Sequence, residues 1–120
     1  MELLGHIKQE IIDLLELKDV DANTPIYIGP TNIDHIKSRH PYEYDKYYAC
    51  TEEILDEPDY IGLNKGSITY VKLYKVDSEY VRVAVKVSMS GRAYVKTLHI
   101  LSTCNAENYI DRGTLKKLDN

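Results

Sequence analysis

Apolar residues recur along the chain at two spacings, which give it a helical first half and a strand-rich second half. Over residues 2–18 they recur every three or four positions, opposite a face with Glu10, Asp13 and Glu16. This pattern predicts an amphipathic helix. A polar linker ends at Pro25. We therefore expect an N-terminal helix over residues 1–20 and a separate domain over 26–118.

The next part of the chain predicts one short strand and two helices. A strand is expected at 26–28. Thr31 followed by Asp34 resembles a capping box, so a helix is expected over 32–40. Tyrosines and aliphatic residues at helical intervals predict a second helix over 42–55. A proline follows each helix and should end it.

In the second half the apolar spacing changes to every second position, which is typical of β-strands. Residues 68–76, 80–88 and 93–101 are rich in Val, Ile, Tyr and Thr and are separated by polar turns. They predict an antiparallel meander, followed by a helix over 105–112. The expected fold class is α+β, with an antiparallel sheet of about four strands and helices packed on one face.

The two faces of the last predicted hairpin can be assigned from its turn at Ser90 and Gly91. An even loop would pair Arg82 with His99 and Lys86 with Val95, and would place the polar side chains on one face. The alternate positions, which include Tyr94, would face the core, where Lys96 is a misfit that must extend its amine to solvent. An odd loop would exchange the faces. The side chains on the polar face would be Arg82, Lys86, Thr97 and His99.

This polar face has two interpretations. Cations and hydroxyls on a rigid sheet can bind a phosphodiester and stabilise the charge that develops as an oxygen attacks phosphorus. Alternatively, these side chains simply face water, as on many half-exposed sheets. Composition alone leaves both interpretations open.

The segment HIKSRHP supplies candidate acid–base groups. Histidine can take a proton from an attacking hydroxyl and return one to a leaving oxygen, as RNA cleavage without a metal requires. At about 100° per residue, His35 and His40 lie roughly 140° apart on a helix, so both cannot point into one pocket. His40 shares the inward face of Ile36, whereas His35 and Arg39 share the opposite side. The alternatives are a partly buried His40 at the helix end and a solvated face for the other two.

Charge is distributed unevenly between the halves of the chain. The net charge is −4, but residues 1–60 hold 14 acids and 5 bases, whereas residues 61–120 hold 5 acids and 10 bases. The second half is therefore able to face phosphate.

Several classes of protein are disfavoured. Cys50 and Cys104 form no CxxC or Cys/His cluster, so neither a disulfide framework nor a structural zinc site is expected. The acids do not cluster at ligand spacing near the histidines, so no metal or cofactor is expected. The longest apolar run is far below the roughly 18 residues of a membrane span, and the first 20 residues carry acids where a signal peptide carries bases. A cytoplasmic protein without membrane contact is expected.

Three segments together carry a family resemblance: the run from IGPTNIDHIKSRHP to EPDYIG, the strand pair VRVAVKVSMSGRAYVKTLHILS, and the ending NYIDRGTLKKL. In this order they resemble the phage-associated nuclease-like domains of the barnase, EndoU, colicin and RelE superfamily. The resemblance covers residues 26–118 and implies a barnase- or RelE-like domain, related to metal-independent ribonucleases and toxins of phages and mobile elements. By position it implies catalytic roles for His35, Arg39, His40, Lys86, Thr97 and Ser102.

The function that this resemblance implies is cleavage of RNA, with tRNA as one candidate, through a 2′,3′-cyclic phosphate. Either histidine would deprotonate the 2′-hydroxyl, and Thr97 or Ser102 would donate to a phosphate oxygen. The expected substrate-binding residues are Arg82, Lys86, Arg92 and His99, with Arg39 also at the phosphate. The alternative is an inactive relative that binds a protein or nucleic acid. An antidote or larger phage protein is an expected partner, and helix 2–18 is a candidate for self-association.

Overall fold

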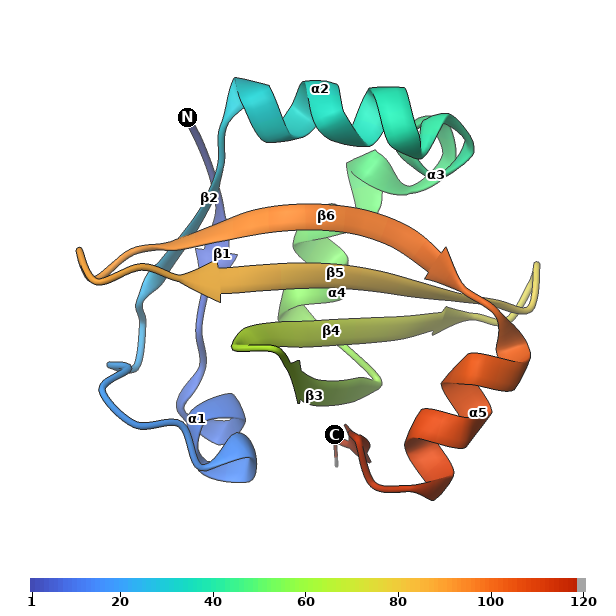
Figure 1. Cartoon of the computed structure of the whole chain (residues 1–120). Coiled ribbons are helices and arrows are strands. Elements are labelled where there is room, and N and C mark those ends of the chain that lie inside the picture. Colours follow the sequence, from blue (N-terminus) through green and yellow to red (C-terminus); the bar gives the residue numbers. More distant parts are fainter. Residues whose placement is uncertain (119–120) are drawn as a thin grey trace.

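Within the residues that the structure describes, seven β-strands form one mixed sheet, and short helices lie on both of its faces (Figure 1). This computed structural model describes residues 1–118. The strands lie across the sheet in the order β1-β2-β6-β5-β4-β3-β7. They are β1 (Glu2–His6), β2 (Pro25–Ile28), β3 (Tyr60–Asn64), β4 (Ser67–Tyr74), β5 (Glu79–Val87), β6 (Ala93–Leu101) and β7 (Leu115–Lys117). The helices are α1 (Gln9–Leu15), α2 (Pro30–Arg39), α3 (Pro41–Tyr47), the 3₁₀ turn η1 (Tyr48–Cys50), α4 (Thr51–Asp56) and α5 (Thr103–Asp111).

The α+β class is confirmed, but the sheet has seven strands rather than about four. The four predicted strands correspond to β2, β4, β5 and β6. The additional strands β1, β3 and β7 have five, five and three residues. Strands this short are held by pairing with their neighbours, which local spacing does not reveal. β2 pairs in parallel with β6, so the sheet is not purely antiparallel.

The predicted helix over residues 2–18 is wrong. Residues 2–6 form β1, which pairs antiparallel with β2, and only residues 9–15 are helical. Ile7, Ile11 and Leu15 are buried in the common core. The apolar stripe is therefore covered by the chain itself, and self-association through an exposed helix loses its structural basis.

β6 contains one extra residue, Lys96, which forms a β-bulge against β5. Beyond the bulge, Lys86 pairs with Tyr94 rather than with Val95 as expected. This shift places Val95 in the core, where it is fully buried, and moves Tyr94 to the opposite face with Lys86. Lys96 remains exposed. The bulge thus removes the misfit that strict alternation had placed in the core.

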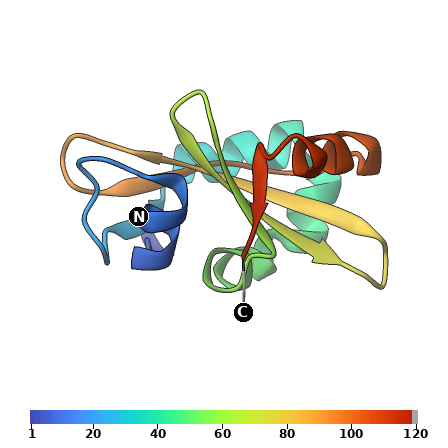
Figure 2. The ribbon, with the colours of Figure 1, turned by 90° about the horizontal axis from the view of Figure 1, so that it is seen from below.

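The helices cover both faces of the sheet, so the expectation that they lie on one face is wrong. α2, α3 and α4 contribute Ile36, Tyr47 and Ile54 to the main core, together with the buried valines of β5. α5 lies on the side of the sheet away from α4 (Figure 2), and its Ala106 is buried. α5 therefore covers one end of the polar face.

Prolines set the boundaries of the helices. α2 begins at Pro30, and the predicted capping box at Thr31 is not formed. Pro41 ends α2 and begins α3, because its ring fixes φ and its missing N–H is not needed in a first turn. The single helix predicted over 42–55 is divided into α3, η1 and α4. Within residues 1–118, no helix combines the length and the apolar character that crossing a membrane requires.

Candidate active site

Two stacked histidine rings join the end of α2 to β6. His40 is the residue at which α2 stops, directly before Pro41. Its ring centroid lies 5.4 Å from that of His99, with 24° between the ring planes. The side chain of His40 is 31% exposed, whereas His99 is half-buried beneath it. His40 is therefore the ring that a substrate reaches more easily.

Arg82 on β5 contacts the second of these histidines from the neighbouring strand. Arg82 and His99 are directly opposite in the β5–β6 register, and Nη1 of Arg82 lies 3.5 Å from Nε2 of His99. Nη2 of Arg82 donates to Oγ1 of Thr69 on β4 at 3.4 Å. The predicted pairing and the predicted polar face are correct in this part of the sheet.

Burial keeps the His99 imidazole neutral. Its pKa is lowered from 6.5 to about 4, chiefly by burial and then by the charges of Arg82 and His40, while Glu43 acts in the opposite direction. Since the Arg82 guanidinium can only donate, Nε2 of His99 is the acceptor and Nδ1 carries the proton. Nδ1 is buried and has no hydrogen-bond partner within residues 1–118. His99 can therefore hold the guanidinium without adding a second positive charge.

Glu43 on α3 fixes the histidine pair to the edge of the sheet. Its Oε2 accepts a hydrogen bond from the backbone N–H of Ile100 at 3.2 Å. The same oxygen lies 3.6 Å from Nδ1 of His40. This contact orients the His40 ring and leaves Nε2 as the nitrogen available to a substrate.

Arg82 borders a pocket of about 120 Å³ between the β3–β4 hairpin, α5 and β7. No ion pair within residues 1–118 involves Arg82. Burial lowers the pKa of Arg82, but a guanidinium remains charged at neutral pH. A half-buried cation without a carboxylate is costly in a protein and favours an anionic ligand. The pocket has apolar walls from Leu63, Leu101 and Tyr109, and polar groups from Asn64, Thr69 and Thr114.

Two other predicted site residues lie on the same face but farther along the strands. Thr97 is two residues from His99 and is partly exposed. Lys86 is exposed and is four residues from Arg82, which corresponds to about 13 Å along a strand. Lys86 therefore lies away from the histidine pair, on the path that a longer ligand would follow.

Three further candidates do not join the histidine pair. His35 and Arg39 are exposed on α2, in agreement with the helical spacing that separates them from His40. Ser102 is the N-cap residue of α5, and its hydroxyl oxygen accepts a hydrogen bond from the N–H of Asn105 at 3.1 Å. The Ser102 hydroxyl thus already has a structural role.

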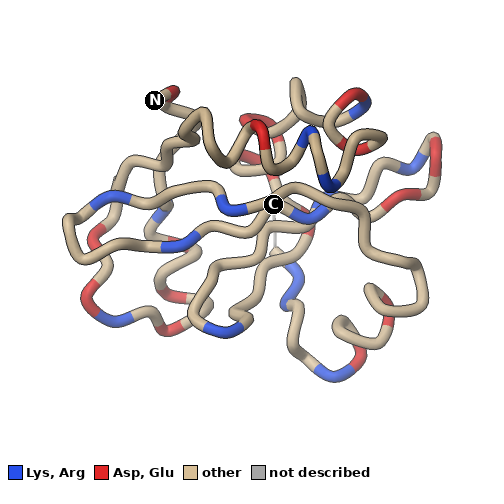
Figure 3. The backbone as a smooth tube through the Cα atoms, turned by 45° about the horizontal axis from the view of Figure 1, so that its top comes forward, with Lys and Arg blue, Asp and Glu red and all other residues tan. Residues whose placement is uncertain are grey.

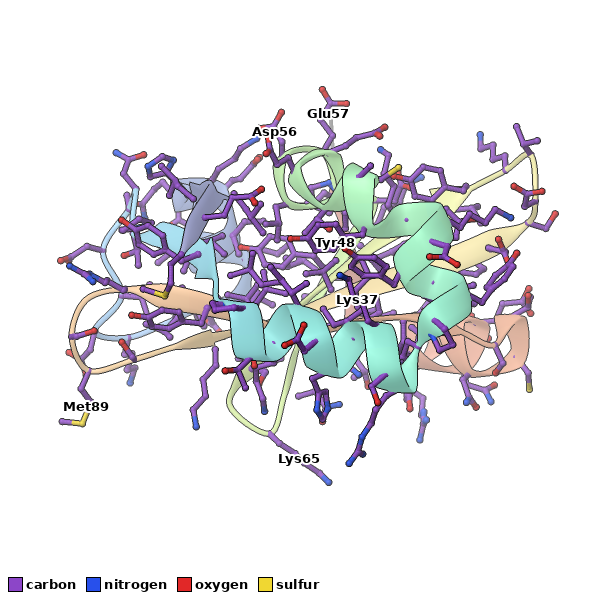
Figure 4. All side chains as sticks on the ribbon, turned by 90° about the horizontal axis from the view of Figure 1, so that it is seen from above. Lys37, Tyr48, Asp56, Glu57, Lys65 and Met89 are labelled. Atoms are coloured by element: carbon purple, nitrogen blue, oxygen red, sulfur yellow. The ribbon has the colours of Figure 1, made fainter. Side chains whose placement is uncertain are left out.

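Beyond Glu79, the neighbouring strands β5 and β6 carry Lys and Arg but no Asp or Glu (Figure 3). No Asp or Glu occurs between Glu79 and Glu107, a span that contains Arg82, Lys86, Arg92 and Lys96. Lys65 on the β3–β4 hairpin projects on the side of the sheet that carries α5, whereas Asp56 and Glu57 project on the opposite side (Figure 4). This separation gives a protein of net charge −4 a surface that attracts a polyanion.

The groups gathered at this site suit an anion better than a cation. Within residues 1–118, no three His, Cys, Asp or Glu side chains come together as a metal-binding group. Cys50 and Cys104 are free, the first partly buried and the second exposed. The guanidinium of Arg82 and the hydroxyl of Thr69 offer hydrogen-bond donors for phosphate oxygens.

Three residues at the site were not predicted from the sequence. Thr69 could have been found by extending the alternating pattern to β4, because it lies opposite Ala84 on the polar face. Glu43 and Tyr109 carry no comparable signal. They come from α3 and α5, and their positions depend on how these helices pack on the sheet.

The face of the sheet formed by β4, β5 and β6 thus carries an arginine beside two stacked histidines, groups that suit a phosphate-containing ligand. A family model described as a phage Barnase-EndoU-ColicinE5/D-RelE like nuclease, PBECR3, matches residues 2–108. The chain belongs to this family of nuclease-like domains, and the match includes the N-terminal segment that forms β1 and α1. Comparisons with curated proteins and with solved structures find no match.

Proposed function

We propose that this protein is a metal-independent ribonuclease whose reaction centre contains Arg82, His99 and His40. One observation carries the proposal: a half-buried guanidinium, which has no carboxylate partner among the described residues 1–118, lies beside two stacked imidazoles and at the border of a pocket. Membership of a nuclease-like family supports a phosphodiester as the anion. Two of the residues expected to be catalytic from the sequence, Lys86 and Ser102, are given other roles in this proposal.

In the proposed reaction, Arg82 binds a non-bridging oxygen of the scissile phosphate. Nε2 of His40 takes the proton from the ribose 2′-hydroxyl, and the 2′-oxygen forms a bond to phosphorus. The bond from phosphorus to the 5′-oxygen breaks, and this oxygen takes a proton from solvent. The products are a 2′,3′-cyclic phosphate and a 5′-hydroxyl end, after which His40 releases its proton to water.

The remaining polar groups support this step. His99 is a positioning residue that accepts from Arg82 and stacks on His40, and its neutrality avoids repulsion with the guanidinium. Thr97 lies on the same face, from which its hydroxyl can donate to a phosphate oxygen. The pocket beside Arg82 offers the adjoining nucleotide apolar walls and a few hydrogen-bonding groups.

Cleavage of a labelled single-stranded RNA in EDTA tests the proposal. We expect wild type to cleave it and to leave a cyclic phosphate. His40→Ala should reduce kcat by about 10²- to 10⁴-fold, and Arg82→Ala by about 10²- to 10³-fold. His35→Ala is the matched control, because His35 is exposed on the same helix and lies outside the centre. Cleavage that survives in both His40→Ala and Arg82→Ala, or that requires a divalent metal, would contradict the proposal.

The alternative is an inactive binding module. The same basic surface would then bind RNA, but the residues of the proposed centre would not cleave it. It predicts that wild type binds the RNA but leaves it intact over a range of pH and salt.

A toxin role for the active enzyme, with an antidote protein in its host system, predicts poor growth of bacteria that express wild type. Growth should recover with His40→Ala if toxicity comes from cleavage, and should stay poor if it comes from binding.

A further inference from the structure

Two tyrosines form a partly exposed aromatic pair beyond the proposed centre. The bulge at Lys96 moves Tyr94 to the open face of the sheet, and the parallel pairing of β2 with β6 places Tyr27 beside it. Their ring centroids lie 6.3 Å apart with 37° between the planes. The guanidinium carbon of Arg92 lies 5.8 Å from the centroid of the Tyr27 ring. Neither tyrosine is fully buried.

Exposed cations lie close to this aromatic pair. Lys86 is exposed and lies directly opposite Tyr94 in the β5–β6 register. Arg92, directly before β6, and Lys96, within β6, are also exposed. Residues 80–106 contain no Asp or Glu. Aromatic rings combined with exposed cations are the usual composition of a site that stacks bases and binds their phosphates.

A second tyrosine pair shows why charge matters. Tyr60 and Tyr80 have almost the same centroid separation, 6.4 Å. The carboxylates of Glu107 and Asp59, however, are near enough to contribute to raising the pKa of Tyr80, after burial and Tyr60. A polyanion would be repelled there. The two tyrosine pairs therefore have almost the same spacing but differ in the charges nearby. The cations beside Tyr27 and Tyr94 make that pair the better candidate for binding bases.

The aromatic pair lies on the same face of the sheet as the proposed centre. Lys86 and Arg82 are on the same face of β5, about 13 Å apart along the strand. A dinucleotide held at Arg82 cannot reach the tyrosines, but a longer strand can follow the open face to them. Bases in a duplex are already stacked and paired, so only an unpaired strand has base faces to offer.

We propose that Tyr27 and Tyr94, with Arg92 and Lys86, form a subsite that stacks a base of single-stranded RNA several nucleotides from the scissile phosphate. The proposal rests on the proposed ribonuclease function and adds a substrate class to it, an unpaired strand longer than a dinucleotide. The subsite supplies affinity and alignment, and it takes no part in proton transfer.

A binding experiment separates the subsite from catalysis. The probe is a fluorescent ten-nucleotide RNA with 2′-O-methyl riboses, which lacks the nucleophile and cannot be cleaved, and Kd is measured by fluorescence anisotropy. We expect Tyr27→Leu with Tyr94→Leu to weaken binding about tenfold or more, whereas Tyr27→Phe with Tyr94→Phe stays within about twofold of wild type. The Phe variant keeps the ring faces, so it controls for loss of the hydroxyls.

Each outcome supports or overturns the inference. Equal affinity of the Leu and Phe variants, or no binding of the probe by wild type, would overturn it. If the Leu variant does not fold, Arg92→Glu takes its place, because Arg92 is exposed in the turn; unchanged affinity in that variant would also overturn the subsite. Failure of wild type to cleave unmodified RNA, with tyrosine-dependent binding intact, would refute the ribonuclease proposal but not the subsite.

Cleavage of substrates of different length gives a second measurement. The ratio of kcat/KM for a ten-nucleotide RNA to that for a dinucleotide should fall in the Leu variant, mainly through a higher KM for the longer substrate. A purely structural role for the tyrosines would lower both values together and leave this ratio unchanged.

Discussion

His99 combines a buried position with a neighbouring cation, and this combination affects stability as well as function. A neutral imidazole is compatible with Arg82 at 3.5 Å, but a protonated one is not. The pKa of about 4 in the folded protein lies below the unfolded value of 6.5. Folding therefore opposes protonation of His99.

The free energy of unfolding should consequently depend on pH through this residue. Between pH 6.5 and about 4 the unfolded chain takes up a proton that the folded protein does not, so the contribution of His99 to stability decreases as pH falls. In His99→Gln the slope of this free energy against pH should be smaller in that window. Urea unfolding at pH 4.5, 5.5, 6.5 and 7.5 measures it, with His35→Gln as the exposed control. Parallel curves for wild type and His99→Gln would contradict the expectation.

Glu43 provides a second test at the level of single residues. Glu43→Gln keeps an oxygen for the N–H of Ile100 but removes the charge beside Nδ1 of His40. We expect kcat for RNA cleavage to fall about tenfold, equivalent to about 1.4 kcal/mol of activation free energy, with KM little changed. The shape of the pH–rate profile should also change, which a merely structural role would not produce. Glu52→Gln, an exposed change on α4, is the control.

The predictable part of the site is the part that depends on local pattern. Arg82 and His99 were placed opposite each other by alternation alone, and His40 was placed inward by helical spacing. Tyr94 was assigned to the wrong face, because one extra residue at Lys96 reverses the positions between it and the turn, 93–95. A bulge is favoured here because burying the Lys96 amine would be costly. The alternating pattern alone, however, does not predict where the bulge lies.

At the level of secondary structure, the hydroxyl of Ser102 provides a stability test that is separate from catalysis. It caps α5, which carries Tyr109 to the pocket beside Arg82. Ser102→Ala should lower the free energy of unfolding by about 1 kcal/mol. Ser102→Asp, which can also cap a helix, should restore most of it. Denaturant unfolding gives the values, and the activity per folded molecule should not show the large loss expected for a catalytic hydroxyl.

The elements that could be predicted are those with long, uniform patterns. β4, β5 and β6 have eight or nine residues each, and their alternation is clear. The N-terminal segment was misassigned because its apolar positions also fit a helix over 2–18. In the structure Leu4 is buried and Leu3 is 47% exposed. This alternation indicates a strand only when the pairing with β2 is known. Tertiary pairing overrides the helical pattern there.

At the scale of the whole molecule, Gly62 is the point at which β3 closely approaches the distant segment that leads into β7. β3 lies between β4 and β7, and a Cβ at position 62 would overlap the carbonyl of Thr114. Gly62→Ala should therefore displace β7, destabilise the protein by about 1–3 kcal/mol and disturb the pocket beside Arg82. Thermal unfolding and RNA cleavage measure the two effects. Gly66→Asn is the control, because position 66 is in an open turn with positive φ, which asparagine tolerates.

The separation of charge across the molecule leads to a prediction about salt. The net charge is −4, so attraction of RNA depends on the local excess of cations on β5 and β6 rather than on the total. For a single strand, log K falls with log salt concentration with a slope of about −0.7 for each phosphate neutralised. Replacing Lys86 and Arg92 together with Ala should thus reduce the magnitude of this slope by about 1.4. Anisotropy titrations of the 2′-O-methyl RNA between 50 and about 300 mM salt measure it.

The matched control is Lys8→Ala with Lys18→Ala, which removes the same charge from the N-terminal half and should leave the slope as in wild type. Equal slopes in all three proteins would show that the strand does not follow this face.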